Sequence, residues 1–306
     1  MKIFTLQAGE KWICDRFVSE WNESNPDTFV QNPQESSIIW LLADWCWNQI
    51  PRDILSRKRV VCTVHHLVPE KFTASARNEF MDRDQYVDLY HVPCTTTQKQ
   101  LQSLTDKPVF VRPFWVNQNI WFPMDKRASR RKHGISDDKF LIGSFQRDTE
   151  GSDLKSPKLE KGPDIFCDIV IEAHRRDQRI VPILAGWRRQ YVVNRLKDAK
   201  VPYYYAELPD FNRLNEMYNW LDLYLVTSRY EGGPQAVLEC AASRTPILST
   251  KVGVSPEILS ANDIIYPDNL IDIVNHVTDV DHAYEKVKDL FMPVGVDAFR
   301  NTFKEI

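Results

Sequence analysis

The chain has 306 residues, of which 43% are hydrophobic and 26% are charged, and its formal net charge at pH 7 is −3. This length suits two domains of ordinary size, each able to bury its own core. Nucleic-acid binders usually carry a strong basic excess, so the slightly acidic balance argues against that class and no nucleic-acid partner is expected.

The cysteines and apolar runs indicate the cellular compartment. The six cysteines are scattered and form no C-x-x-C pair: Cys14, Cys46, Cys62, Cys94, Cys167 and Cys240. This distribution predicts buried, reduced thiols rather than a disulfide framework or a zinc site. Residues 1–6 lack the apolar length of a signal peptide, and no stretch reaches the roughly 18 apolar residues of a membrane span. We expect a cytoplasmic protein, and peripheral contact with a membrane surface stays open.

Short apolar strands alternate with helical stretches, which predicts an α/β fold with parallel sheets. In the first part we expect strands at 2–6, 37–42, 59–64, 87–92 and 109–112, and helices at 10–21, 72–83 and 95–102. In the second part we expect strands at 140–145, 179–185, 202–205, 221–226 and 246–249. Helices are expected there at 162–175, 188–197, 211–219, 234–242 and 256–259, with 269–303 mostly helical.

Three stretches break this rhythm. Residues 113–123 carry two prolines and two asparagines, which is typical of an interdomain connection. The charged segment 148–160 predicts a mobile loop. A basic run is expected to form the solvated face of a short helix that ends at Gly134, with a membrane or phosphate patch as the alternative. The run consists of Lys126, Arg127, Arg130, Arg131 and Lys132.

The segment 229–257 is the most informative part of the chain. A strand ends before Glu231, and Pro234 suits the first position of the helix that follows, because its missing N–H costs nothing there. Gly232 and Gly233 leave room for a ligand to approach the backbone. The amino end of a helix favours a phosphate. Taken without its surroundings, the same pattern is also that of an ordinary strand–loop–helix turn.

Two carboxylates bracket this predicted phosphate site. Glu231 lies just before the helix and Glu239 lies inside it, on the same helical face as Gln235. A carboxylate accepts hydrogen bonds from paired sugar hydroxyls. The spacing of the two glutamates, the intervening E-G-x-P and Pro246 make a specific combination.

This combination resembles glycosyltransferase family four, whose members have the GT-B fold. The residues that fit the family pattern are Glu231, Gly232, Pro234, Glu239, Ala242, Pro246, Val252, Gly253 and Glu257. Upstream, the similarity continues through the lead-in 130–137, the strand 140–146 with Arg147 after it, the pair Lys161-Gly162, and the strand that ends at Gly186. The match covers roughly residues 110–260.

The chain departs from the family pattern at three points. Arg244 stands where the family favours glycine, and Val254 replaces the second glycine of a G-G pair. Residues 148–160 make the gap between the arginine and the lysine longer than usual. Lys155 or Lys158 is therefore an alternative to Lys161 as the second phosphate-binding cation.

The resemblance implies an α/β protein of two Rossmann-like domains facing across a cleft, with a short N-terminal domain. Residues 1–115 would form the acceptor-binding domain and residues 116–285 the nucleotide-sugar-binding domain. Residues 286–306 would form a helix that packs back on the N-terminal domain. The oligomeric state stays open.

The resemblance also implies the reaction: a retaining hexosyltransferase moves a sugar from a nucleoside-diphosphate sugar, UDP or GDP, to a glycan, lipid-linked or other hydroxyl acceptor. No metal or other cofactor is expected. Arg147, Lys161 and the helix end would neutralise the pyrophosphate, which suits the charge that develops on the leaving group. The implied donor-binding residues are Arg147, Lys161, Gly186, Gly232, Gly233, Pro234 and Glu239, the last on the ribose. Glu231 would contact the transferred sugar and its anomeric carbon.

The N-terminal half offers further candidates. His65 and His66 end a predicted strand, and the family often places a histidine near there, so His65 is the second candidate catalytic residue, although paired histidines are more often structural. Gly9, Asp44 and Trp45 are weaker candidates for the acceptor site, because Gly9 also suits a plain turn and a tryptophan also suits the core.

Two other functions fit the same motifs. The first is a nucleotide-sugar epimerase of GT-B fold, which would need catalytic acids in the N-terminal half, where this chain has few suggestive carboxylates. The second is a catalytically inactive accessory subunit that binds a nucleotide-sugar, which the short N-terminal domain keeps open.

Overall fold

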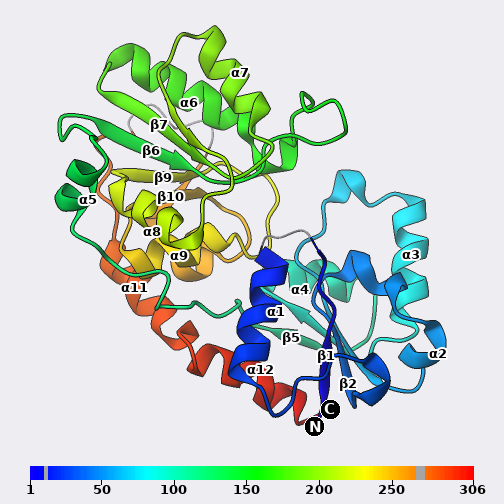
Figure 1. The fold of residues 1–306 in the computed structure, drawn as a ribbon. Coiled ribbons are helices and arrows are strands. Elements are labelled where there is room, and N and C mark those ends of the chain that lie inside the picture. The colour runs from blue at the N-terminus through cyan, green and yellow to red at the C-terminus, as the bar shows by residue number, and fades with distance from the viewer. Residues whose placement is uncertain (10–12, 267–272) are drawn as a thin grey trace. The chain divides into compact units, whose positions relative to one another are not determined.

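The computed structural model describes residues 1–9, 13–266 and 273–306. The chain forms two compact units (Figure 1). Unit 1 consists of Met1–Trp115 and Leu290–Ile306, and unit 2 consists of Val116–Asp289. In the described part of the chain, every helix is too short or too polar to cross a membrane.

Unit 1 contains a parallel five-stranded sheet whose strands follow the chain order. The strands are β1 (Ile3–Thr5), β2 (Ile38–Leu41), β3 (Arg59–Thr63), β4 (Leu89–Val92) and β5 (Val109–Val111). β2 and β4 are buried along their whole length. Strands covered on both faces read as continuous apolar runs, which is why the sequence pattern located them.

The two faces of this sheet pack against different helices. Trp40 packs with α1 (Ile13–Ser24) and α12 (Val294–Phe303), whereas the neighbouring Ile39 and Leu41 point into the second core. Successive side chains of a strand face opposite sides, so β2 serves both cores. The second core is covered by α2 (Arg52–Leu55), α3 (Ala74–Asp84) and α4 (Thr95–Gln102).

The last described residues complete the first of these cores. α1 and α12, drawn in blue and red, lie side by side on unit 1 (Figure 1). Phe303 meets Trp40 edge-on with ring centroids 5.0 Å apart, and Phe299 stacks on Phe114 at 5.7 Å. Phe299 is fully buried. The aromatic cluster is therefore closed by residues from both ends of the chain.

Unit 2 contains a parallel six-stranded sheet in the order β11-β10-β9-β6-β7-β8. Its strands are β6 (Phe140–Ser144), β7 (Ile180–Ala185), β8 (Tyr204–Ala206), β9 (Leu223–Val226), β10 (Ile247–Thr250) and β11 (Ile264–Ile265). Its helices are α5 (Lys126–Lys132), α6 (Pro163–Arg176), α7 (Gln190–Asp198), α8 (Phe211–Trp220), α9 (Gln235–Ser243), α10 (Ser255–Ile258) and α11 (Val280–Val287).

Some predicted elements differ from the structure. The helix predicted at 10–21 is α1, and residues 10–12 lie outside the described residues. The long helix predicted over 269–303 was wrong for residues 273–279, which are not helical, and 269–272 lie outside the described residues. Helical order resumes in α11 and α12, which belong to different units and have Pro293 between them.

Candidate functional site

The residues of the predicted donor site follow strands of unit 2 that meet where the strand order reverses. β6 lies between β7 and β9, so the chain leaves β6 toward one edge and leaves β9 toward the other. Open parallel sheets bind ligands beyond the carboxyl ends of their strands at such a point. Arg147 follows β6 and Glu231 follows β9, so both lie beyond this edge.

Lys161 and Glu231 form a short ion pair. Lys161 Nζ lies 2.6 Å from Glu231 Oε1, and the two side chains are only 15% and 9% exposed. The hydroxyl of Ser228 donates to the same carboxylate oxygen at 3.3 Å. The fold thus brings together a cation and a carboxylate that were predicted separately and lie 70 residues apart in the chain.

Gln146 fixes the backbone that carries Lys161. Its Nε2 donates to the Lys161 carbonyl at 2.7 Å, and its Oε1 lies 3.3 Å from the Ser228 hydroxyl, which shares its single proton between this oxygen and Glu231. Gln146 therefore ties the end of β6 to both loops of the site. No role was predicted for Gln146, although its position directly before Arg147 was a usable signal.

Gly162 has a conformation and a neighbour that exclude other residues. Its φ of +60° lies in the left-handed region, and a Cβ there would lie 1.8 Å from the carbonyl oxygen of Thr227. The Thr227 hydroxyl donates to the Gly162 carbonyl at 2.8 Å. The loop that carries Lys161 and the loop that carries Glu231 therefore touch at a point where only glycine fits.

Arg147 is held beside an aromatic ring. Its Nε donates to the Thr149 carbonyl at 2.9 Å, and its guanidinium carbon lies 5.6 Å from the ring centroid of Trp187. Trp187 directly follows Gly186 and is 40% exposed. A cation over an indole ring is a favourable contact. Trp187 was missed at the sequence level, because its role depends on a neighbour forty residues away.

The long gap between Arg147 and Lys161 is closed by a small hairpin, residues 148–158. Thr149 and Pro157 form an antiparallel bridge, and the Lys158 amide donates to the Asp148 carbonyl at 2.8 Å. Asp153 caps the tip by accepting from the amides of Lys155 and Ser156. The hairpin brings Lys158 back beside Asp148. The extra residues between Arg147 and Lys161 are therefore accommodated within the hairpin.

The base of this hairpin is held by a buried ion pair. Arg189 Nε lies 2.9 Å from Asp148 Oδ2, and both side chains are 1% exposed. Arg189 also donates to the Ser144 carbonyl at 2.6 Å, and the amides of Asp148 and Thr149 donate to the Arg188 carbonyl. Buried charges persist in proteins when they are paired and hydrogen-bonded, as here. This end of the segment, predicted as a mobile loop, is buried.

The hairpin separates the two alternative lysines. Lys155 lies at the exposed tip, whereas the side chain of Lys158 is 23% exposed and lies 3.7 Å from Glu160. Burial lowers the pKa of Lys158, the charges of Lys161 and Arg147 lower it further, and Glu160 and Glu231 oppose them. Lys158 thus shares the electrostatic environment of the predicted site.

The amino end of α9 differs slightly from the prediction. The helix begins at Gln235, and Pro234 is the residue before it rather than its first residue. Among the residues that the structure describes, no side chain caps this end. The side-chain nitrogen and oxygen of Gln235 are both buried and make no hydrogen bond in the described part of the chain. Unfilled donors at the start of a helix suit an anion.

The glycines at this end of the sheet allow backbone segments to pack closely together. The Gly232 carbonyl accepts from the Val254 amide at 2.8 Å, and a Cβ on Gly253 would lie 2.1 Å from that same oxygen. Gly233 follows, half-buried, and Gly186 at the end of β7 accepts from the Tyr205 hydroxyl at 2.9 Å. Gly232 and Gly253 thus clamp the loop before α9 to the loop before α10.

Glu239 is buried and already has a partner. It is 5% exposed, and its Oε2 accepts from the Tyr218 hydroxyl at 2.8 Å. Burial raises the pKa of Tyr218 well above its usual value, and the charge of Glu239 adds to this, so the phenol stays a neutral donor. Tyr218 orients one oxygen of Glu239, and binding of ribose by this carboxylate stays a prediction.

The departure at Arg244 has a structural explanation. Arg244 ends α9 with a φ of 54°, in the left-handed region that favours the glycine typical of this position. Its guanidinium pairs with Asp281 and lies 4.1 Å from the ring centroid of Tyr284. Both partners lie on α11, so Arg244 makes contacts at this position that a glycine could not make. At the second departure, Val254 is buried, where a glycine would leave space.

His65 lies in unit 1 just after β3 and is well anchored. Its Nε2 lies 2.9 Å from the Leu42 carbonyl, which can only accept, so this nitrogen carries the proton. Its ring stacks on Phe114 with centroids 5.7 Å apart, and Cys14 Sγ lies 3.7 Å from Nε2. His66 beside it is half-buried, and the choice between the two histidines stays a prediction.

The three weaker acceptor-site candidates also belong to unit 1. Trp45 is 46% exposed, and its ring lies 5.7 Å from that of His65. Asp44 pairs with the buried Arg83 at 3.0 Å. Gly9 adopts a φ of +71°, and its amide donates to Asp15 at 3.0 Å. Trp45 and His65 are brought together, whereas Asp44 is engaged in a structural ion pair.

The basic run is largely neutralised within unit 2. Lys126 and Arg130 pair with Asp222 at 2.5 and 2.6 Å, and Lys132 pairs with Glu216 at 2.5 Å. Arg130 is buried. These partners disfavour the alternative interpretation as a patch for a membrane or for phosphates.

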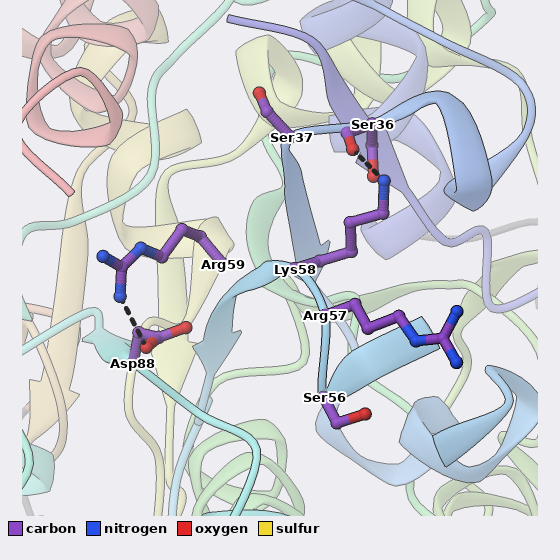
Figure 2. A pocket seen from close by; sticks show the side chains of 7 residues that line it. All are labelled: Ser36, Ser37, Ser56, Arg57, Lys58, Arg59 and Asp88. Carbon is purple, nitrogen blue, oxygen red and sulfur yellow. Dashed lines mark hydrogen bonds and ion pairs between the residues drawn. The ribbon is translucent and has the colours of Figure 1, made fainter. Parts of the chain in front are cut away.

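A separate open cavity of ≈ 490 Å³ lies in unit 1 (Figure 2). It is lined by Ser36, Ser37, Ser56, Arg57, Lys58, Arg59 and Asp88. Figure 2 shows Arg59 turned to Asp88, and Lys58 donates to the Ser36 carbonyl at 2.5 Å. These residues lie at the amino ends of β2, β3 and β4, the edge opposite to His65. No predicted site residue lines this cavity.

The site is built from lysine, arginine, glutamate and backbone groups. Within residues 1–9, 13–266 and 273–306, no group of three or more histidine, cysteine, aspartate or glutamate side chains is arranged to hold a metal ion. All six cysteines are free and buried, as predicted.

Comparison with known proteins bears on both units. Residues 154–290 match the model of the family described as "Glycosyl transferases group 1". No curated protein matches the chain significantly. Among solved structures, HepE of Anabaena in complex with UDP superposes with a TM-score of 0.76 at 14% identity, covering 100% of both chains. HepE with UDP-glucose gives 0.80 at 12% identity, covering 99% of both chains.

A third structure extends the comparison. Sucrose-phosphate synthase of Thermosynechococcus elongatus gives a TM-score of 0.70 at 15% identity and covers 98% of this chain and 83% of that one. At such low identity these matches show the fold alone. The predicted resemblance and the predicted class of two α/β units with parallel sheets are confirmed. Residues 154–290 of this protein are therefore similar to the glycosyl transferases group 1 family, and the chain has the fold of GT-B glycosyltransferase structures.

Proposed function

We propose that this protein is a retaining, metal-independent hexosyltransferase that moves a sugar from a nucleoside-diphosphate sugar to a hydroxyl of a glycan or lipid-linked acceptor. The observation that carries the proposal is the Lys161–Glu231 ion pair of 2.6 Å, located inside the matched family segment and next to the uncapped end of α9. A cation, a carboxylate and a helix end suit a diphosphate bonded to a sugar.

In this proposal the leaving diphosphate is stabilised by fixed positive charge. Negative charge grows on it as the glycosidic bond breaks, and preorganised cations and amide groups lower the barrier most when they need not move. Arg147 is held by Thr149 and Trp187, and Lys161 by Glu231 and its braced backbone. These contacts are the preorganisation that the mechanism requires.

The carboxylates would act on the sugars. Glu231 would contact the transferred hexose and steady the electron-poor anomeric carbon, while Glu239, oriented by Tyr218, would bind the ribose. The acceptor would meet Trp45 and His65 of unit 1, whose rings lie 5.7 Å apart. Aromatic faces suit sugar rings, and an imidazole suits a reacting hydroxyl.

A uridine nucleotide is the donor we favour. The similar HepE structures are complexes with UDP, with UDP and glucose, and with UDP-glucose, which supports UDP over GDP for this chain as well. A cytoplasmic location belongs to the same proposal and is supported by six free, buried cysteines.

A panel of nucleotide-sugars tests the proposed reaction. With UDP- and GDP-hexoses we expect slow hydrolysis of one donor, faster in the presence of a suitable acceptor, with the anomeric configuration retained in the product by NMR. Interconversion of donor sugars would instead identify an epimerase. Binding without turnover for every donor and acceptor would identify an accessory subunit.

Removal of metal ions tests the second part of the proposal. Because Lys161, Arg147 and the helix end supply the positive charge, EDTA should change the initial rate by less than about twofold, well below the effect of a lost oxyanion contact. The measurement is the rate of UDP release with and without EDTA, followed by added Mn²⁺. Complete loss of activity with rescue by Mn²⁺ would contradict the metal-independent mechanism.

A further inference from the structure

The hairpin 148–158 places Lys158 within the electrostatic reach of Arg147 and Lys161, two residues of the proposed donor site. Lys158 follows the antiparallel bridge of Thr149 with Pro157, and its amide is bonded to Asp148, the residue after Arg147. Only Leu159 and Glu160 separate Lys158 from Lys161. Arg147, Lys158 and Lys161 therefore all lie close in sequence to the hydrogen bond between Asp148 and Lys158, although the hairpin separates Arg147 from the two lysines.

The ammonium group of Lys158 keeps most of its hydrogen-bonding capacity. An ammonium has three donors. Among the described residues its nearest acidic partner is Glu160 Oε1 at 3.7 Å, which is longer than a hydrogen bond. Lys161, by contrast, is bonded to Glu231 at 2.6 Å. Among the described residues, Lys158 therefore has more donors left for a ligand than Lys161, which has spent one on Glu231.

Without a bound anion, the charged form of Lys158 is destabilised at this position. Its side chain is 23% exposed, and its pKa is lowered first by burial and then by the charges of Lys161 and Arg147. Like charges that share a partly buried place repel one another, and phosphate oxygens placed among them would remove that cost. The arrangement therefore suits an anion that carries more than one negative charge.

The base of the hairpin is held by buried contacts, which fix the backbone position of Lys158. The ion pair of Asp148 with Arg189, whose side chains are both 1% exposed, holds the base of the hairpin. The Arg188 carbonyl also accepts hydrogen bonds from two amides of the hairpin. We propose that Lys158 is a third diphosphate-binding cation, which acts together with Arg147 and Lys161 rather than in place of Lys161. The inference rests on the proposed function, because it assigns a further residue to the same donor site.

Calorimetry with UDP and uridine tests this role. Lys158→Gln should weaken UDP binding about tenfold or more, as expected for a lost charged hydrogen bond. Uridine lacks the phosphates, so its affinity should change by less than about twofold. Lys158→Arg should restore most of the affinity for UDP.

Lys155→Gln is the matched control, because it removes the same charge from the exposed tip of the same hairpin. It should leave UDP binding unchanged, and Lys161→Gln should weaken it. Thermal melting checks that all variants fold. Equal UDP affinity for Lys158→Gln and Lys155→Gln, with a loss for Lys161→Gln, would overturn the inference and leave the proposed function standing. Failure of the wild-type protein to bind UDP or GDP at all would overturn both.

Discussion

A Gly162→Ala protein should unfold about 2–4 kcal/mol more easily than the wild type, the sum of a left-handed backbone penalty and an overpacking cost. The added Cβ would lie 1.8 Å from the Thr227 carbonyl oxygen. That oxygen belongs to the backbone, so no side-chain rotation relieves the clash, and the loops that carry Lys161 and Glu231 must separate. Denaturant unfolding of unit 2 and UDP binding should both report the change.

Gly134→Ala is the control that isolates the packing part. Gly134 has a similar φ of +65°, but nothing lies within 4 Å of a Cβ built on it. Only the backbone penalty applies, so the loss should be about 1 kcal/mol, and UDP binding should be unchanged. Both glycines belong to unit 2, so the same unfolding transition serves for both. Equal losses for the two variants would contradict the close contact at Gly162.

Replacing Glu231 with glutamine should lower kcat for sugar transfer by about 10²–10³-fold, the size of effect seen when one preorganised electrostatic contact is removed. The amide has the shape of the carboxylate but carries no charge to hold Lys161 or to steady the anomeric carbon. Affinity for UDP should stay within a few-fold, because the phosphate-binding cations remain. Initial rates and calorimetry with the donor found in the panel separate the two effects.

Glu216→Gln is a matched loss of charge outside the site. Glu216 lies on α8 and pairs with Lys132 and His133, so its removal breaks an ion-pair network of the same unit. Its kcat should remain within about twofold of the wild type. If Glu231→Gln kept wild-type kcat, Glu231 would have no part in catalysis.

The parallel strands were the easiest elements to predict. β2 and β7 lie inside their predicted ranges, because a strand buried on both faces must be apolar along its length. The motif around Glu231 was also readable, since glycine and proline at fixed spacing encode a turn into a helix. In both cases the signal is local, within one strand or one turn.

Contacts between distant segments could not be predicted in the same way. A role for Trp187 is indicated only by its contact with Arg147. Lys158 differs from Lys155 because the hairpin leaves Lys158 partly buried and Lys155 exposed. The helix predicted over 269–303 failed for a related reason. Residues 273–279 are not helical, and the segments on either side of Pro293 pack into different units. Periodicity does not show which core a helix serves.

The membership of residues 290–306 in unit 1 has a consequence for biosynthesis. Phe299 and Phe303 leave the ribosome after all of unit 2, although they close a core begun by Trp21 and Trp40. Domains usually fold in the order in which they are made. Here the core on one face of the first sheet stays incomplete until unit 2 has been made, so the amino-terminal half is expected to depend longest on chaperones.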